Sequence, residues 1–333
     1  MSEYGEMIGI TSTIPVEIIY AAGRVPVDIN NSFIASKDPA SLVRRAKTDG
    51  FPDTTCSWIC GLYGAVLERG IGTVVGVTGG DCAETIALME VLSLRGIDVI
   101  PFSYPHGRDP VSLQTEIDRF AERFGVGIPR AEEEKKRLDR IRRRIHHLDR
   151  LLWEEDRALG GEVQLLQLGS TDFEGDPDSY LAKVDEKITE IESRKPLETA
   201  LRLGFVGVPP IISNLYDTIE RDGVRIVFNE VQRQFTLPLG NTIGESYTHY
   251  TYPYGIFARA KDIALEVKRR RIDGIIHYVQ AFCFRGIEDI ALRRELGIPV
   301  LTLQGDTPSR VTETMRLRIE AFVDVLHRRK DRR

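Results

Sequence analysis

Four cysteines, Cys56, Cys60, Cys82 and Cys283, are the side chains of this sequence best suited to chemistry. Cys82 follows the apolar run TVVGVTGGD and Cys283 follows HYVQAF, and an amphipathic segment begins directly after each. Cys56 stands directly before SWICGLYGAVLE, which also has the pattern of a helix. At a first helical turn, unpaired backbone N–H groups and the helix dipole favour a thiolate. We therefore expect lowered thiol pKa values and an anionic ligand set at these positions.

The spacing of the cysteines leaves several kinds of site open. Cys56 and Cys60 are separated by three residues, which matches neither a ferredoxin, a zinc ribbon nor a redox Cys-x-x-Cys motif. Three thiolates would leave one iron of a four-iron cubane with an exchangeable position, able to take a substrate oxygen as a Lewis acid. A zinc site that uses all four thiolates and simple burial of small apolar thiols are the alternatives.

Other motifs do not provide a site of a recognisable type. The glycines of GIGTVVG precede a strand instead of following one, so they do not form a dinucleotide-binding turn. The segment GVTGGDCAET lacks the lysine of a phosphate-binding loop. His277 lies inside a predicted strand and His249 in SYTHYTYPYG, and we interpret both as packed or exposed histidines, not ligands. The tyrosine-rich stretch either lines a cleft or covers a sheet edge.

The elements that must position the thiols alternate between short apolar runs and amphipathic segments. Four runs in the C-terminal part, LRLGFVG, VRIVFNEV, IDGIIHYVQAF and IPVLTLQGD, are each followed by a helical pattern. The N-terminal part repeats this order with MIGITST, VPVDIN, TVVGVTGG and IDVIPFSYP. Serial β–α units predict parallel sheets with helices on both faces. Binding sites in such sheets form beyond the carboxyl ends of the strands.

A long amphipathic helix is predicted between the two parts. The segment AEEEKKRLDRIRRRIHHLDRLLWEEDRALGG has apolar residues at three- and four-residue steps: Leu138, Ile141, Ile145, Leu148 and Leu152. We interpret it as a connecting or dimer-facing scaffold. GSTDFEGDPDS, further on, has the composition of a loop.

These patterns together predict an α/β protein with two doubly wound Rossmann/flavodoxin-like parallel-sheet domains and a long connecting helix. The expected division is 1–129 for an N-terminal cluster-binding domain, 130–198 for a helical connector and 199–333 for a C-terminal domain. Because the cysteines are distributed over both domains, a bound metal centre would lie in the cleft between them.

Composition excludes some functions. The chain has 333 residues and a net charge of -5, which gives no general attraction for nucleic acid. The basic clusters at 140–144 and at the C-terminal end are expected to be a solvated helix face and a frayed tail. No apolar run reaches the length of a membrane span, and the start MSEYGEM carries acids where a targeting segment would be basic. We expect a cytoplasmic protein.

Five segments, in their order along the chain, carry a family resemblance: TSTIPVEIIYAAGRVPVDIN, TTCSWICGLYG, GGDCAETIALMEVL, DGIIHYVQAFCFRGIED and GIPVLTLQGDTPSRVTETMRLRIEAF. The sequence resembles the 2-hydroxyacyl-CoA dehydratase family, specifically the D-component of 2-hydroxyglutaryl-CoA dehydratase. Benzoyl-CoA reductase subunits and double-cubane cluster proteins are relatives of this family. The resemblance covers most of the chain outside residues 130–195.

The resemblance implies a [4Fe-4S] cluster held by Cys56, Cys82 and Cys283, one from each cysteine-bearing motif. Cys60 would then be an extra thiol on the same helix face, with packing as its expected role and an alternative ligand as the other possibility.

The resemblance also places Ser12, Thr13 and Glu17 near the cluster as catalytic residues. The competing interpretation is an ordinary helix start, with Thr13 as the cap, Pro15 after it and Glu17 in the first turn.

The implied function is that of an iron–sulfur subunit in a 2-hydroxyacyl-CoA dehydratase-like lyase. In this family a separate ATP-dependent iron–sulfur activator delivers one low-potential electron, the thioester is reduced to a ketyl radical, and the 2-hydroxyl group leaves. The missing phosphate-binding loop agrees with this division of labour. The chain would pair with itself or with a related subunit.

Two alternatives stay open beside this function. One is a reductase of small molecules in which each chain holds half of a shared double-cubane [8Fe-9S] cluster. The other is a non-enzymatic electron-transfer or assembly protein whose cysteines are buried or bind zinc. The stretch HYTYPYGIFARAKD departs from the family pattern and leaves the acyl substrate open.

Overall fold

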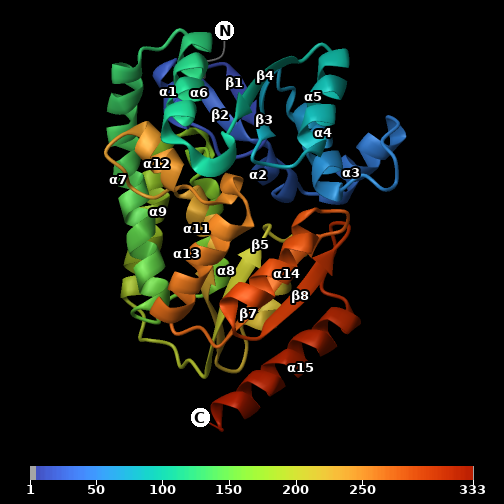
Figure 1. The fold of residues 1–333 in the computed structure, drawn as a ribbon, viewed down its shortest axis with the longest axis vertical. Helices are drawn as coiled ribbons and strands as arrows, with labels where there is room; N and C mark the ends of the chain where they lie inside the picture. Colours follow the sequence, from blue (N-terminus) through green and yellow to red (C-terminus); the bar gives the residue numbers. More distant parts are fainter. Residues whose placement is uncertain (1–4, 333) are drawn as a thin grey trace. The chain divides into compact units, whose positions relative to one another are not determined.

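The computed structural model describes residues 5–332, and within this range the strands form two four-stranded parallel sheets (Figure 1). Contacts divide the chain into two compact units. The N-terminal unit is the chain up to Ile145 with Leu168–Val184 and Gln234–Gly255. The C-terminal unit is His146–Gln167, Asp185–Arg233 and the chain from Ile256 onward. The predicted α/β class with two parallel-sheet domains is confirmed.

The sheet of the N-terminal unit has the strand order β2-β1-β3-β4. Its strands are β1 (Met7–Ile10), β2 (Val25–Asp28), β3 (Thr73–Gly79) and β4 (Asp98–Ser103). The helices and 3-10 turns of this unit are α1 (Val16–Ala21), α2 (Ile29–Ile34), α3 (Pro39–Thr48), α4 (Ser57–Arg69), α5 (Glu84–Leu94), η1 (His106–Arg108), α6 (Pro110–Arg123), η2 (Phe173–Gly175), α12 (Ile243–His249) and η3 (Tyr252–Tyr254).

Helix α5 packs closely on strand β3. A Cβ atom added to Gly76 of β3 would lie 2.0 Å from the sulfur of Met89 in α5, so a larger residue here would require the Met89 side chain to move. Helices α4 and α5 lie next to each other, as Figure 1 shows. The short loop that carries Cys82 therefore joins a strand and a helix that pack closely on each other.

The sheet of the C-terminal unit repeats the same topology with the order β6-β5-β7-β8. Its strands are β5 (Leu201–Gly207), β6 (Val224–Asn229), β7 (Gly274–Gln280) and β8 (Val300–Gly305). Its helices are α10 (Leu215–Ile219), α13 (Ile256–Arg269), α14 (Arg285–Leu296) and α15 (Glu313–Lys330). Four helices contain residues of both units: α7 (Ile128–Trp153), α8 (Gly160–Gly169), α9 (Pro177–Glu192) and α11 (Glu230–Phe235).

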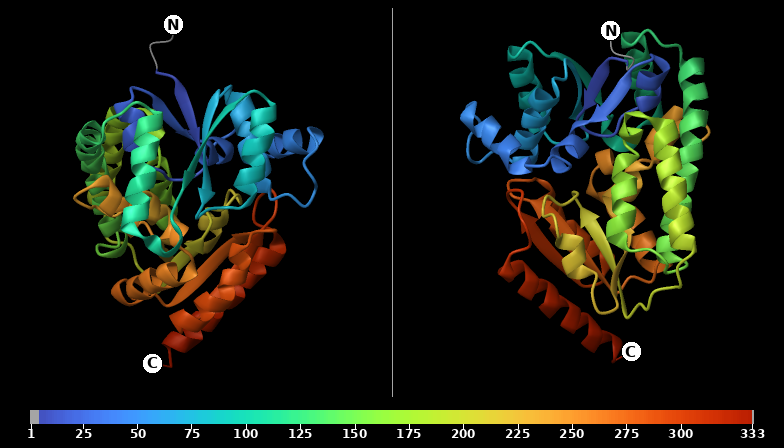
Figure 2. Two further views of the ribbon diagram at one scale, coloured as in Figure 1. Left: turned by 45° about the horizontal axis from the view of Figure 1, so that its top comes forward. Right: turned by 180° about the vertical axis from the view of Figure 1, so that it is seen from behind.

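Two apolar clusters cover the two faces of the C-terminal sheet. One cluster joins the strands to α10 and α15 and includes Phe205, Tyr216 and Leu326. The other joins them to α13 and α14 and includes Ile263 and Leu292. Figure 2 shows α15 running along its face of this sheet. Helices on both faces make the sheet doubly wound, as the continuous apolar strands predicted.

The long amphipathic helix is confirmed as α7, and the five apolar residues used to predict it are all buried. It ends at Trp153, earlier than the pattern indicated. The expectation of a solvated basic cluster is wrong for Arg142, which is 1% exposed and pairs with Glu17 and Asp139. Arg142 lies four residues after Leu138 and so belongs to the buried stripe of the helix. The predicted boundaries after residues 129 and 198 stay a prediction.

Candidate functional site

Cys82 and Cys283 occupy equivalent places in the two units. Strand β3 ends at Gly79, Cys82 follows three residues later, and α5 begins at Glu84. Strand β7 ends at Gln280, Cys283 follows three residues later, and α14 begins at Arg285. Both strands occupy the third place in sheets of the same order. Each thiol therefore lies beyond the carboxyl end of an interior strand, where binding sites of parallel sheets form.

The helix starts next to Cys56 and Cys82 are linked within the N-terminal unit. Cys56 is the N-cap of α4, and its backbone N–H donates a hydrogen bond to the carboxylate of Glu84. Glu84 is the first residue of α5, two positions after Cys82. Burial raises the pKa of Glu84, and its Oε2 atom has no hydrogen-bond partner among residues 5–332. The start of α4 is thus tied to the start of α5, although nothing in the sequence marked Glu84.

The environment of Cys283 differs from the expected thiolate pocket. Burial raises the pKa of this thiol, while the backbone N–H and the guanidinium of Arg285 act in the opposite direction. The expectation of a lowered pKa is therefore wrong for Cys283, because desolvation outweighs the helix terminus. The N–H group and the positive charge still favour a bound anionic sulfur over a free one.

Cys60 lies fully buried in the first turns of α4. Its sulfur is 4.0 Å from the carbonyl oxygen of Thr55, and burial raises its pKa to about 11. A thiol with so high a pKa stays protonated near neutral pH and behaves as a small apolar group. This environment favours the packing role over the role of an alternative ligand.

Ser12, Thr13 and Glu17 are all buried just beyond β1, at 8%, 2% and 0% exposure. Helix α1 has Pro15 as its N-cap residue, with no side-chain cap. Thr13 is therefore not the cap, and this part of the helix-start interpretation is wrong. The hydroxyl of Thr13 has no hydrogen-bond partner in the described part of the chain. Glu17 lies in the first turn, as expected.

Glu17 is held by two side chains that are far away in the sequence. The guanidinium of Arg142 lies 2.8 Å from its Oε1 atom, and the hydroxyl of Tyr247 donates to Oε2 at 3.1 Å. The same hydroxyl also donates to the carbonyl oxygen of Ile14. Because Glu17 and Arg142 are both excluded from water, the carboxylate is committed to this ion pair and fixes the segment between β1 and α1.

The tyrosine-rich stretch covers the carboxyl edge of the N-terminal sheet. The ring of Tyr104, which follows β4, lies 5.9 Å from Tyr250 and 5.7 Å from Tyr254, edge to face in both pairs. Pro253 packs so close to Gly80, three residues after Val77 in β3, that a Cβ there would lie 2.7 Å from the proline Cβ. The stretch therefore lies against the loop that carries Cys82.

One member of this stretch faces the Ser12 segment. The hydroxyl of Tyr250 lies near the hydroxyls of Ser12 and Thr13. It is fully buried and makes no hydrogen bond within residues 5–332. Burial raises its pKa, so it stays a neutral hydroxyl. Buried hydroxyls without partners are costly and are typical of sites that bind a polar group. Tyr250 is a candidate site residue that the sequence indicated only as part of an aromatic loop.

The two histidines behave as interpreted. His277 in β7 is fully buried, and its Nδ1 atom lies 2.8 Å from Oδ1 of Asp289. Burial lowers its pKa, so the ring is packed in its neutral form. His249 at the end of α12 is exposed.

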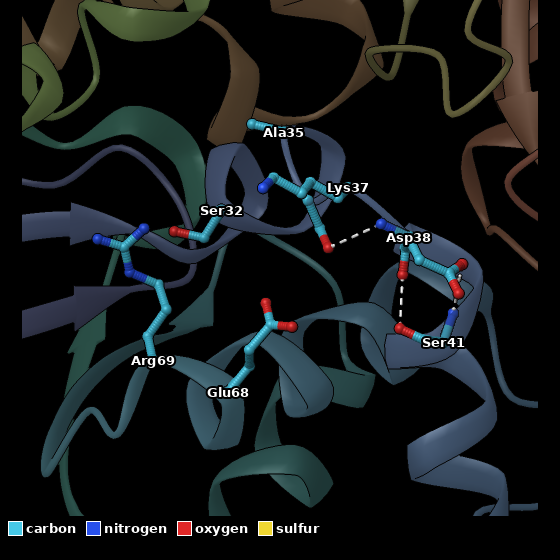
Figure 3. Close-up of a pocket in the computed structure, with 8 residues that line it drawn as sticks. Ser32, Ala35, Lys37, Asp38, Ser41, Glu68 and Arg69 are labelled. Atoms are coloured by element: carbon cyan, nitrogen blue, oxygen red, sulfur yellow. Dashed lines mark hydrogen bonds between the residues drawn. The ribbon is translucent and has the colours of Figure 1, made fainter.

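A surface hollow of about 420 Å³ lies elsewhere in the N-terminal unit, between α2, α3 and the end of α4 (Figure 3). The lining residues are Ser32, Ala35, Ser36, Lys37, Asp38, Ser41, Glu68 and Arg69. Its cations and carboxylates are mostly exposed, and none of the predicted site residues lines it. The hollow is therefore separate from the candidate site.

No three His, Cys, Asp or Glu side chains within residues 5–332 are gathered as a ready-made metal site. The predicted ligand set is distributed, with Cys56 and Cys82 in the N-terminal unit and Cys283 in the C-terminal unit. None of the helices in the same range is both long and apolar enough to cross a membrane.

A model of the family described as 2-hydroxyglutaryl-CoA dehydratase, D-component, matches residues 11–326. The chain belongs to this family. A comparison with curated proteins found no match. The family match includes every predicted site residue, from Ser12 to Cys283. Membership of the D-component family makes the chain a dehydratase-like subunit and indicates an enzyme.

The chemistry of the thiols suits an iron–sulfur cluster of the kind that the resemblance implies. Iron–sulfur clusters are held by cysteine thiolates and tuned by hydrogen bonds and charges near the sulfurs. Cys56 and Cys82 lie on neighbouring loops at helix N-termini, and the backbone N–H and the positive charge of Arg285 both act on the sulfur of Cys283. A zinc site built from all four thiolates would also need Cys60, whose burial raises its pKa to about 11.

Proposed function

We propose that the chain is the iron–sulfur subunit of a 2-hydroxyacyl-CoA dehydratase-like enzyme in which Cys56, Cys82 and Cys283 bind a [4Fe-4S] cluster. The observation that carries the proposal is the equivalent placement of Cys82 and Cys283 in two repeated sheets, in a chain of this family. When bound, the cluster supplies a low-potential electron and an open iron for the thioester oxygen of the substrate.

The side chains near Cys82 provide what such a reaction needs from the protein. The buried rings of Tyr104 and Tyr250 keep water away from this edge of the sheet, which protects a radical from quenching. The hydroxyls of Thr13 and Tyr250 have no hydrogen-bond partner within residues 5–332, and together with the nearby hydroxyl of Ser12 they would orient a polar group of the acyl chain. Glu17 would be a positioning residue, because its ion pair with Arg142 holds the segment that carries Ser12 and Thr13.

The proposed partners follow from the family chemistry. An ATP-dependent iron–sulfur activator would deliver the electron, and the chain would pair with itself or with a related subunit. The first acyl substrate to test is 2-hydroxyglutaryl-CoA, because the family description names it.

Metal analysis of oxygen-free protein tests the cluster assignment. We expect about four iron and four acid-labile sulfide per chain, the content of one cubane. Cys56→Ala, Cys82→Ala and Cys283→Ala should each lose most of this iron. Cys60→Ala is the matched control and should keep it, because Cys60 is a buried packing residue. Zinc as the bound metal, or full iron in Cys283→Ala, would contradict the assignment.

Turnover tests the reaction. The cluster-loaded chain, alone and with a related subunit of the family, is combined with a family activator, ATP, a low-potential reductant and 2-hydroxyglutaryl-CoA, and formation of the 2-enoyl-CoA is followed by mass spectrometry. We expect loss of water that depends on ATP and the activator. A loaded cluster that is reduced under these conditions without dehydrating this or other 2-hydroxyacyl-CoA thioesters would refute the lyase function and favour the reductase or electron-transfer alternatives.

A further inference from the structure

A largely buried network of ion pairs runs along the carboxyl edge of the C-terminal sheet and ends at Arg285, two residues after Cys283. Glu230 directly follows β6 and accepts a hydrogen bond from the backbone N–H of Gly207, the last residue of β5, at 3.2 Å. Arg259 of α13 donates to both oxygens of Glu230, at 2.9 and 2.8 Å. Arg259 also donates to Glu288 of α14.

Arg285 is the last member of this network of ion pairs. Its Nη1 atom donates to Oε1 and Oε2 of Glu288 at 3.3 and 3.2 Å. Arg285 is 2% exposed, and its guanidinium lies 5.0 Å from the ring centroid of Phe284. It is two residues after Cys283, and its backbone N–H and side-chain charge both act on that thiol. The guanidinium is therefore buried and held by Glu288, two residues along the chain from the thiol on which its charge acts.

The free energy needed to bury these charges indicates that the ion-pair network has a role other than stabilising the fold. Glu230 and Arg259 are both fully buried, and the desolvation of such charges can outweigh their attraction. An apolar quartet of the same volume would pack without that cost. What the ionic network adds is a guanidinium, that of Arg285, held in one place by Glu288, which Arg259 binds in turn.

We propose that Arg285 is a positioning residue that holds a fixed positive charge beside Cys283 and so raises the reduction potential of the cluster bound there. This inference rests on the proposed function. Reduction adds one negative charge to the cluster, and a nearby positive charge in a medium of low polarity stabilises the reduced form. Arg285 thereby makes the bound cluster easier to reduce.

The network makes two predictions of opposite sign. Arg285→Gln removes the positive charge and should lower the midpoint potential, whereas Glu288→Gln removes the neighbouring negative charge and should raise it. Arg285→Lys keeps the charge and should stay near the wild-type value. Arg294→Gln is the matched control, because Arg294 lies on the same helix but is exposed to solvent.

The experiment is an oxygen-free redox titration of the full cluster-loaded chain, followed by electron paramagnetic resonance. For Arg285→Gln we expect at least a tenfold change in the one-electron reduction equilibrium, which is about 59 mV toward negative potential. For Arg294→Gln we expect less than a twofold change. Iron and sulfide are measured for each variant, so that the comparison uses loaded protein only.

The outcomes separate this inference from the function on which it rests. Wild-type protein that binds no cluster overturns both. Loaded variants at Arg285 and Glu288 whose potentials equal the wild-type value, or shift in the same direction, overturn the role of Arg285 and leave the cluster assignment intact. If Arg285→Gln does not retain iron, the shift in Glu288→Gln decides the question: a rise supports the role and an unchanged potential overturns it.

Discussion

At the scale of single residues, the N-terminal unit contains a pair of buried carboxyl groups. Oδ2 of Asp172 accepts the backbone N–H of Asp28 at 2.6 Å. Burial, together with the charge of Asp28, raises the pKa of Asp172 to about 7. Burial raises the pKa of Asp28 as well. The folded protein therefore holds a proton that the unfolded chain would release near its ordinary pKa of 3.8.

This pair should make stability depend on pH. Between about pH 4 and pH 7 the folded state binds more protons than the unfolded state, so the free energy of unfolding falls as the pH rises. One such group contributes a slope of at most about 1.4 kcal/mol per pH unit. Asp28→Asn removes the neighbouring charge and should reduce the slope. Denaturant unfolding at a series of pH values measures it.

The control for this experiment is Asp53→Asn, which removes a carboxylate with a 93% exposed side chain. It should keep the wild-type slope. Equal slopes in wild-type protein and Asp28→Asn would show that the charge of Asp28 does not contribute to the raised pKa of Asp172.

The same scale shows what the sequence could predict about the thiols. Their places at helix starts followed from local patterns, since a strand, a short loop and an amphipathic segment are readable in one stretch of chain. The raised pKa of Cys283 and the role of Glu84 were not predictable in this way. Both depend on which elements cover the thiol loops, and this is decided by tertiary packing.

At the scale of elements, α7 contributes more than an apolar stripe. Arg142 pairs with Glu17 of α1 and with Asp139 one turn earlier, and its guanidinium also lies 5.6 Å from the ring centroid of Phe173. The helical period predicted which face of α7 is buried. It could not predict that a carboxylate from residue 17 would meet that face, because their pairing joins segments 125 residues apart.

Replacing Arg142 should therefore lower the free energy of unfolding more than replacing an exposed arginine of the same helix. Arg142→Met leaves Glu17 buried without its counter-charge, and removing one partner of a buried pair costs about 3–5 kcal/mol. Arg143→Met, at the exposed next position, should change stability by less than about 0.5 kcal/mol. Urea unfolding of both variants makes the comparison. Similar losses in the two variants would argue that the pair contributes nothing specific.

At the scale of the whole molecule, each unit is assembled from separate segments of the chain. Segment 168–184 supplies Asp172 to the N-terminal unit, and segment 234–255 supplies Tyr247 and Tyr250. The alternation of strands and helices predicted both sheets correctly, because each β–α step is local. It could not predict that segments 168–184 and 234–255 pack in the N-terminal unit, because these segments contain no strand of their own.

The C-terminal unit likewise contains a separate segment, His146–Gln167, that pairs with its buried arginines. Arg270 is 1% exposed and donates to both oxygens of Asp149, at 2.9 and 2.6 Å. Arg202 and Arg225 both pair with Asp156. The two aspartates lie in His146–Gln167, outside the predicted domain 199–333. A fragment cut at the predicted boundary would keep three buried arginines and lose carboxylates that neutralise them.

We therefore expect residues 199–333 expressed alone to lack a cooperative fold. Uncompensated buried charges cost several kcal/mol each, and the whole stability of a domain is about 5–15 kcal/mol. Near-ultraviolet circular dichroism and thermal unfolding should show no fixed aromatic packing and no sharp transition. A fragment that begins at His146 restores Asp149 and Asp156 and should recover part of the native signal. Cooperative unfolding of the shorter fragment would instead support a self-sufficient domain with the boundary that the sequence predicted.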